Sequence, residues 1–244
     1  MSEESIGDAI YNFFPKNSSG MTVEHVVAMP VPCYARILPP AVKVQLGNPV
    51  LVRWSDVARH NGEVIGQESA WEEISGLDVE DGQPGIWDGA PTSGYFDDVT
   101  ALTLTSILAD MYPEENSVWG GIYEWRLHTS LTAGYLETTE PFGGQTQSHF
   151  SDLNVSDRFV CNASFEYQGF QMQLLHGAVR ELLQVAVCPR IPANLLWSIT
   201  NRWCIAAPSD LKSIYIGGSN QLIKSIIASH DIESFEVYGN NAVC

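Results

Sequence analysis

Basic residues are scarce in this chain. The sequence has 12 lysine and arginine residues against 29 aspartate and glutamate residues, so the formal net charge of its 244 residues is −17. A chain with this charge repels polyanions, which argues against direct binding to nucleic acid or to an anionic membrane. The same charge attracts a basic protein partner, although an acidic surface also serves solubility alone.

Long apolar runs are lacking too. No stretch approaches the roughly 18 apolar residues that a membrane-spanning helix needs. The opening stretch, MSEESIGDAIYNFF, is acidic and lacks the basic residues that begin a secretory signal. We therefore expect a cytoplasmic protein with no membrane partner, and the sequence leaves its oligomeric state open.

Cysteine motifs and catalytic motifs are missing as well. The five cysteines, at positions 33, 161, 188, 204 and 244, are scattered and include no C-x-x-C pair, which favours reduced thiols in a cytosol. The sequence has no P-loop, no dinucleotide-binding fingerprint and no G-x-S-x-G elbow. His149, Asp152 and Asp157 share one polar loop, but their spacing matches no known metal-ligand pattern. We predict no catalytic residue, no metal and no cofactor.

The elements that are present predict an α+β fold, with a mixed, mainly antiparallel sheet, helices packed on it and long irregular loops. Residues 1–20 are expected to form a helix (Ile6–Phe14) and a joint. Residues 21–244 are expected to form a single domain, with a possible subdivision near 129–157. The polar, glycine-rich stretches 63–93 and 129–157 are the two long loops.

The segment Arg202–Val237 has the clearest signals for where its strands and helix begin and end. Trp203–Ala207 and Ser213–Ile216 are short apolar runs typical of strands, and Gly217-Gly218 is expected to end the second one. Ser219 stands where a helix N-cap would stand, before apolar residues with helical spacing, and Ile232–Val237 returns as an extended segment.

The other expected elements follow from the same period and cap rules. They are an extended stretch over Val23–Leu38, a helix Asp56–His60 capped by Ser55 and closed by Asn61-Gly62, a helix from Asp97-Asp98 to Met111, a strand Val118–Leu127 kinked or bulged at Gly120-Gly121, a hairpin around Tyr167–Gly169, and a helix Ala178–Val187.

The strongest functional indication is a concentration of acidic and aromatic residues, since interfaces use aromatic anchors while charge gives specificity and association rate. This candidate partner-binding surface consists of Asp78, Glu80, Asp81, Trp87, Asp88, Tyr95, Asp97 and Asp98. It favours a non-enzymatic protein that binds a basic protein partner, for example an immunity protein or an antitoxin-like inhibitor. A solvated acidic loop explains the same residues.

The alternative site is the turn Gly217-Gly218-Ser219, with Arg202 nearby. A glycine-rich turn that opens a helix presents free backbone N–H groups, which suit an anion such as phosphate and therefore a small-ligand binder or an enzyme. An ordinary strand-to-helix turn with Ser219 as its cap is the structural explanation. A subunit of a larger assembly, marked by an exposed apolar patch, is a third possibility.

Five short motifs occur in order along the chain: YARILPP at Tyr34–Pro40, VRWSDVA at Val52–Ala58, WDGAP at Trp87–Pro91, RWCIA at Arg202–Ala206 and YIGGS at Tyr215–Ser219. Together they resemble a family of bacterial hypothetical proteins, mainly actinobacterial, whose members have no established activity. The resemblance covers roughly residues 30–237 and implies no catalytic residue. The segment between Trp125 and Asn162 is longer and more polar than the family pattern.

Overall fold

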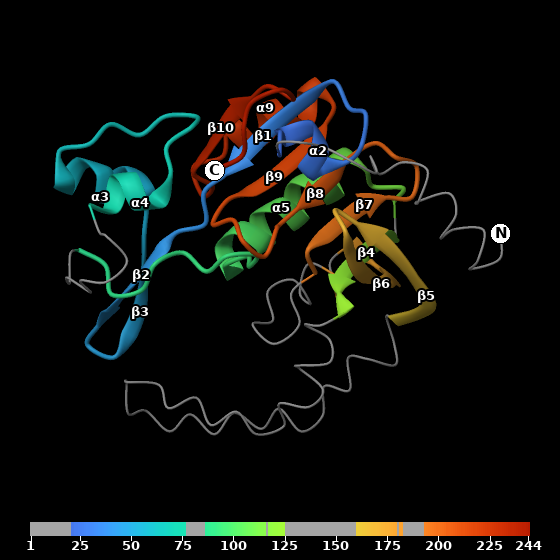
Figure 1. Ribbon diagram of the computed structural model, residues 1–244, viewed down its shortest axis with the longest axis horizontal. Coiled ribbons are helices and arrows are strands. Elements are labelled where there is room, and N and C mark those ends of the chain that lie inside the picture. The colour runs from blue at the N-terminus through green and yellow to red at the C-terminus, as the bar shows by residue number, and fades with distance from the viewer. Residues whose placement is uncertain (1–20, 77–85, 116, 125–159, 180, 183–192) are drawn as a thin grey trace.

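The computed structural model describes residues 21–76, 86–115, 117–124, 160–179, 181–182 and 193–244 (Figure 1). Several expected features lie outside these ranges: the helix Ile6–Phe14, the loop 129–157 with its candidate metal ligands, most of the helix Ala178–Val187, and three acidic residues of the candidate surface, Asp78, Glu80 and Asp81.

An eight-stranded sheet is the centre of the fold, in the order β10-β1-β9-β8-β7-β4-β6-β5, and every neighbouring pair is antiparallel. The prediction of an α+β fold with a mainly antiparallel sheet is therefore confirmed. The strands are β1 Cys33–Ile37, β4 Val118–Tyr123, β5 Val160–Tyr167, β6 Phe170–Gly177, β7 Leu195–Ser198, β8 Cys204–Ala206, β9 Ile214–Gly218 and β10 Ser234–Val237.

Both faces of the sheet are covered, and the strands alternate between two cores as the twofold period of a strand requires. Ile214 and Ile216 of β9 face a core shared with the helices α5 (Asp98–Met111) and α9 (Asn220–Ile227). Tyr215, between them, faces a second core shared with the short helix α2 (Val23–Val27).

A lateral lobe with its own core lies beside the sheet, at the left of Figure 1. It consists of the hairpin β2 (Ala41–Gln45) and β3 (Asn48–Val52), the helices α3 (Trp54–Asn61) and α4 (Trp71–Ser75), and residues 86–89. Three indole rings stack edge to face in its core, because Trp71 lies 5.2 Å from both Trp54 and Trp87.

A buried arginine joins the lobe to the sheet. Arg36 of β1 is 1% exposed, and its guanidinium donates to the carbonyl oxygens of Gln67 and Ser69, each at 2.8 Å, and to Ser213 Oγ at 2.9 Å. The same guanidinium lies 5.5 Å from the ring centroid of Trp54. Because the guanidinium is charged, the hydrogen bonds that hold the loop carrying Gln67 and Ser69 are charge-assisted.

Two expected elements begin differently in the structure. The prediction of an extended stretch over Val23–Leu38 is wrong for its first half. Val23, Val26 and Val27 have helical spacing and form α2 before β1 begins. Helix α3 starts at Trp54, and Ser55 is not its cap. Glu233 caps it instead, accepting from Trp54 N at 2.7 Å and from Ser55 N at 2.9 Å.

A kink or a bulge was expected at Gly120-Gly121, and the bulge is wrong. β4 pairs with β6 in one continuous register from Val118 to Tyr123. Close packing explains these glycines, since a Cβ on Gly121 would lie 2.7 Å from the Phe165 ring. The hairpin around Tyr167–Gly169 is confirmed, with Gln168 and Gly169 as its two-residue turn.

Candidate functional site

The acidic surface predicted from the sequence is only partly one surface. Trp87 and Asp88 belong to the lobe and are structural. Trp87 stacks on Trp71, while Asp88 accepts from Val44 N at 2.7 Å and donates its own N–H to Val42 O at 2.8 Å. Asp88 therefore fixes the edge of the hairpin β2–β3, although its side chain remains exposed.

Asp97 lies apart from the lobe core, at the start of α5. It is the N-cap of that helix, and its carboxylate accepts from Thr100 N at 3.0 Å and from Thr100 Oγ1 at 2.5 Å. The acidic pair therefore opens the helix as the sequence predicts. Asp98 is exposed in the first turn, and Tyr95 is half-buried just before the cap.

The lobe adds carboxylates that the sequence reasoning missed. Glu63, Glu68, Glu72 and Glu73 are all exposed on or beside α3 and α4. A readable signal was present: residues 63–98 contain ten carboxylates, at positions 63, 68, 72, 73, 78, 80, 81, 88, 97 and 98, and no lysine or arginine. The acidic surface therefore begins earlier in the chain than predicted.

Hydrogen bonds to its backbone hold the loop that carries Glu68 in place. Arg36 binds the carbonyls of Gln67 and Ser69, and Gly66 N donates to Ser69 Oγ at 2.9 Å. Above these contacts lies an open depression of about 670 Å³, lined by residues 64–69 and Glu73. Glu68 and Glu73 are among the lining residues. Glu73 Oε2 also accepts from Ala70 N at 3.1 Å, and Glu68 Oε1 accepts from Asn241 Nδ2 at 3.3 Å.

Cations of the described chain are largely committed to its own groups. Arg59 pairs with Asp56 at 2.8 Å, and Lys212 pairs with Glu72 of the lobe. Partial burial acts to raise the pKa of Glu72, but its hydrogen bonds, first among them that from Lys212, lower it overall. Because these pairs are internal, they leave Glu63, Glu68 and Glu73 as negative charge facing solvent.

The alternative anion site was expected to be a glycine-rich turn with free backbone N–H groups, but its two glycines lie within a strand. Gly217 and Gly218 are buried residues of β9, and α9 starts after Ser219. A Cβ on Gly217 would lie 2.5 Å from Val31 Cγ2 and 2.7 Å from Val27 Cγ1, so packing explains this glycine. Ser219 is confirmed as the N-cap, accepting from Leu222 N at 3.2 Å.

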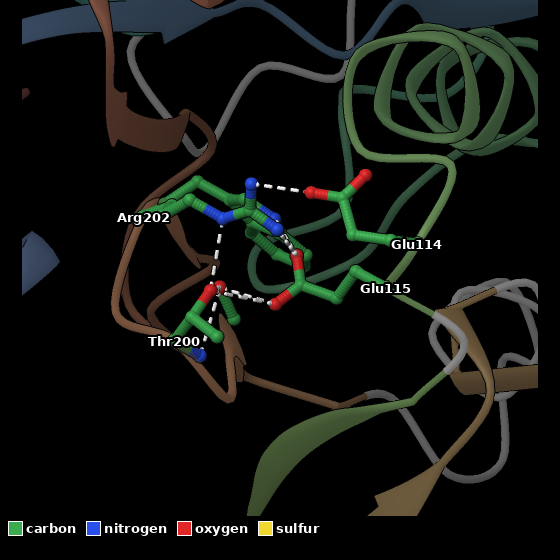
Figure 2. Close-up of polar contacts among 6 residues, drawn as sticks. Glu114, Glu115, Thr200 and Arg202 are labelled. Carbon is green, nitrogen blue, oxygen red and sulfur yellow. Dashed lines mark hydrogen bonds and ion pairs between the residues drawn. The ribbon is translucent and has the colours of Figure 1, made fainter.

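Arg202, the fourth residue of that alternative site, points toward two carboxylates (Figure 2). It donates from Nη1 to Glu114 Oε1 at 2.6 Å and from Nε to Thr200 Oγ1 at 2.9 Å, and its guanidinium carbon lies 4.6 Å from the ring centroid of Tyr112. The structure therefore joins Arg202 to the segment after α5, where its charge is already paired.

Glu115 beside it is a buried carboxylate, with its side chain only 4% exposed. It accepts from Trp203 Nε1 at 2.9 Å, from Thr200 Oγ1 at 3.3 Å and from Ser198 Oγ. Figure 2 shows Glu115, on the segment after α5, facing Thr200 and Arg202 of the β7–β8 turn. Sequence reasoning missed this centre, which ties the end of α5 to the sheet through a fully hydrogen-bonded carboxylate.

Comparison with family models, curated proteins and solved structures returned no match. The resemblance to a bacterial family therefore stays a prediction. Within the described ranges, no three histidine, cysteine or acidic side chains gather so that they could hold a metal ion. None of the helices in that part of the chain is both long and apolar enough to cross a membrane.

Proposed function

We propose that this chain is a non-enzymatic, cytoplasmic binding protein that docks a basic protein partner through its lateral lobe, in the manner of an immunity protein or antitoxin-like inhibitor. The supporting observation is the acidic segment 63–73. The buried Arg36 anchors its backbone at Gln67 and Ser69, and Glu63, Glu68 and Glu73 are exposed, while Glu72 pairs with Lys212. A surface fixed before binding loses less conformational entropy when a partner docks.

The electrostatics support the same function. The lobe projects to one side of the sheet in Figure 1. In the sequence, residues 63–98 hold ten of the chain's 29 carboxylates and none of its 12 cations. Five of the ten, Glu63, Glu68, Glu72, Glu73 and Asp88, lie in the described part of the lobe, which also carries Lys43 and Arg59. A patch of one sign steers an oppositely charged protein and raises its association rate, with a strong dependence on ionic strength.

Two charge-matched double variants test the proposal. The lobe variant is Glu63→Gln with Glu68→Gln, and the control is Asp110→Asn with Glu166→Gln, which are also exposed but lie at the end of α5 and on β5. Each removes two negative charges. Native co-purification from the host at low salt should return a stoichiometric basic partner with the wild type and the control, and much less with the lobe variant.

High salt should release that partner, because exposed charges are screened within about 8–10 Å at physiological ionic strength and within less at higher salt. Recovery of no stoichiometric partner at low salt, or equal recovery by the two variants, would contradict docking through the lobe.

A further inference from the structure

The hairpin β2–β3 projects from the lobe at the lower left of Figure 1 and ends in a two-residue turn, Leu46-Gly47. Both residues have positive φ, +53° and +82°, a conformation that favours glycine, asparagine and aspartate and is unfavourable for leucine. Leu46 is also 95% exposed. The β5–β6 hairpin has the same turn geometry with a polar residue, Gln168, at this position. Leu46 therefore suits neither the local backbone nor the solvent.

One face of the hairpin behind this tip is apolar. Cross-strand partners share a face, and the pairs Val42–Leu51 and Val44–Pro49 alternate with pairs that carry Lys43, Gln45 and Asn48. Val44 and Leu51 are 40% and 42% exposed. Leu51 also lines a cavity of about 150 Å³ together with Val99 of α5, and the other lining residues of this cavity are mostly polar or charged.

The edges of this hairpin are poorly suited to pairing with a strand of a partner. The outward-facing edge of β2 is occupied, because Val42 N donates to Gly89 O at 2.9 Å and Val44 N donates to Asp88. The register puts Pro49 and Leu51 on the free edge of β3. Proline has no N–H, which protects an edge strand from strand addition. Side chains, and not the backbone, are therefore the groups available for docking.

We infer that the hairpin tip and its apolar face dock into an apolar site on the same basic partner, so that Leu46 acts as the anchor while the acidic lobe supplies the steering. This inference rests on the proposed function. Its occupant is identified by charge: carboxylates of Asp97, Asp231 and Glu233 line the cavity beside Leu51, with Arg53 as the one cation among the lining residues. A second copy of this chain, at a net charge of −17, is the less favourable occupant.

Two synthetic peptides serve as probes. One has lysine on one helical face and leucine on the other, and the second has serine in place of each leucine, so that their charges are equal. Fluorescence anisotropy would give the affinity of each for the wild type, for Leu46→Asn and for Ile199→Asn. Ile199 is the matched control, because it is an exposed aliphatic residue beyond the other end of α5, a helix of 14 residues and therefore about 21 Å long.

The wild type should bind the leucine peptide about tenfold more tightly than the serine peptide, as burial of one aliphatic side chain predicts. Leu46→Asn should abolish that difference and leave the serine peptide unaffected, while Ile199→Asn should change neither affinity. Asparagine suits the turn better than leucine, so a loss of affinity would not reflect unfolding.

Equal wild-type affinities for the two peptides would overturn the inference and leave the proposed function standing. Binding of neither peptide at low salt would contradict both. Self-association in sedimentation velocity that Leu46→Asn abolishes would also overturn the inference, because the occupant would then be a second copy.

Discussion

Replacing Gly217 with alanine should destabilise the protein strongly. The new Cβ would lie 2.5 Å from Val31 Cγ2 and 2.7 Å from Val27 Cγ1, and 3.1 Å from Tyr34 Cδ1. These distances are below van der Waals contact, and a branched valine side chain has little rotamer freedom with which to move away. The Gly217 backbone does not have positive φ, so alanine itself is compatible with the local conformation and the clash is the whole cause.

The magnitude follows from two opposing effects. Overpacking a well-packed core costs about 1–3 kcal/mol, and a lower entropy of the unfolded chain returns up to about 1 kcal/mol. Because both close contacts are stiff, we expect a net loss of about 2 kcal/mol. For a chain of this length, each kcal/mol lowers the melting temperature by about 2–4 °C, so the expected fall is about 4–8 °C.

Circular dichroism during heating and during urea titration would measure this loss. Gly218→Ala should be milder, because its Cβ would meet the mobile end of Leu222 at 2.6 Å. Gly89→Ala is the control, since nothing lies within 4 Å of its Cβ. If Gly217→Ala melted within about 1 °C of Gly89→Ala, a packing role for Gly217 would be untenable, on the scale of 2–4 °C per kcal/mol.

Three further predictions use the same assays. Glu115→Ala should cost about 1–3 kcal/mol, because Trp203 Nε1 would be buried without an acceptor while Ser198 Oγ would keep only its contacts with Thr200, and Glu114→Ala, at an exposed ion pair, should leave the melting temperature unchanged within error. Leu46→Asn should stabilise the fold by about 1 kcal/mol by relieving an unfavourable positive φ, and a destabilised variant would contradict the turn geometry. Burial raises the pKa of the Cys204 thiol, so iodoacetamide followed by mass spectrometry should modify Cys204 only after unfolding.

Local rules predicted those parts of the fold that depend on neighbouring residues. Asp97 marks the start of α5 and Pro113 lies beyond its end, while Ser219 marks the start of α9. The hairpin turn at Gly169 was equally readable. The expected stretch over Val23–Leu38 failed because a five-residue helix leaves too few apolar positions for the two periods to be distinguished.

Features that depend on residues far apart in the chain could not be predicted from the sequence. β1 pairs with β9 and β10, which follow it by about 180 to 200 positions, and no local pattern encodes that pairing. Glu233 caps a helix that begins at Trp54, and Arg36 anchors a loop 31 and 33 residues away. The candidate surface was predicted only in part for the same reason. Composition indicates an acidic segment, whereas the roles of Asp88 and Asp97 depend on contacts formed in the folded chain.

Binding of the lysine–serine peptide across a range of salt concentrations would test the central claim most directly. The measurement compares the wild type with the two charge-matched variants, Glu63→Gln with Glu68→Gln and Asp110→Asn with Glu166→Gln. Docking through the lobe predicts that the lobe variant binds more weakly at low salt and depends less on salt than the control does. Equal losses in the two variants would mean that only net charge matters, and the lobe would then not be the docking surface.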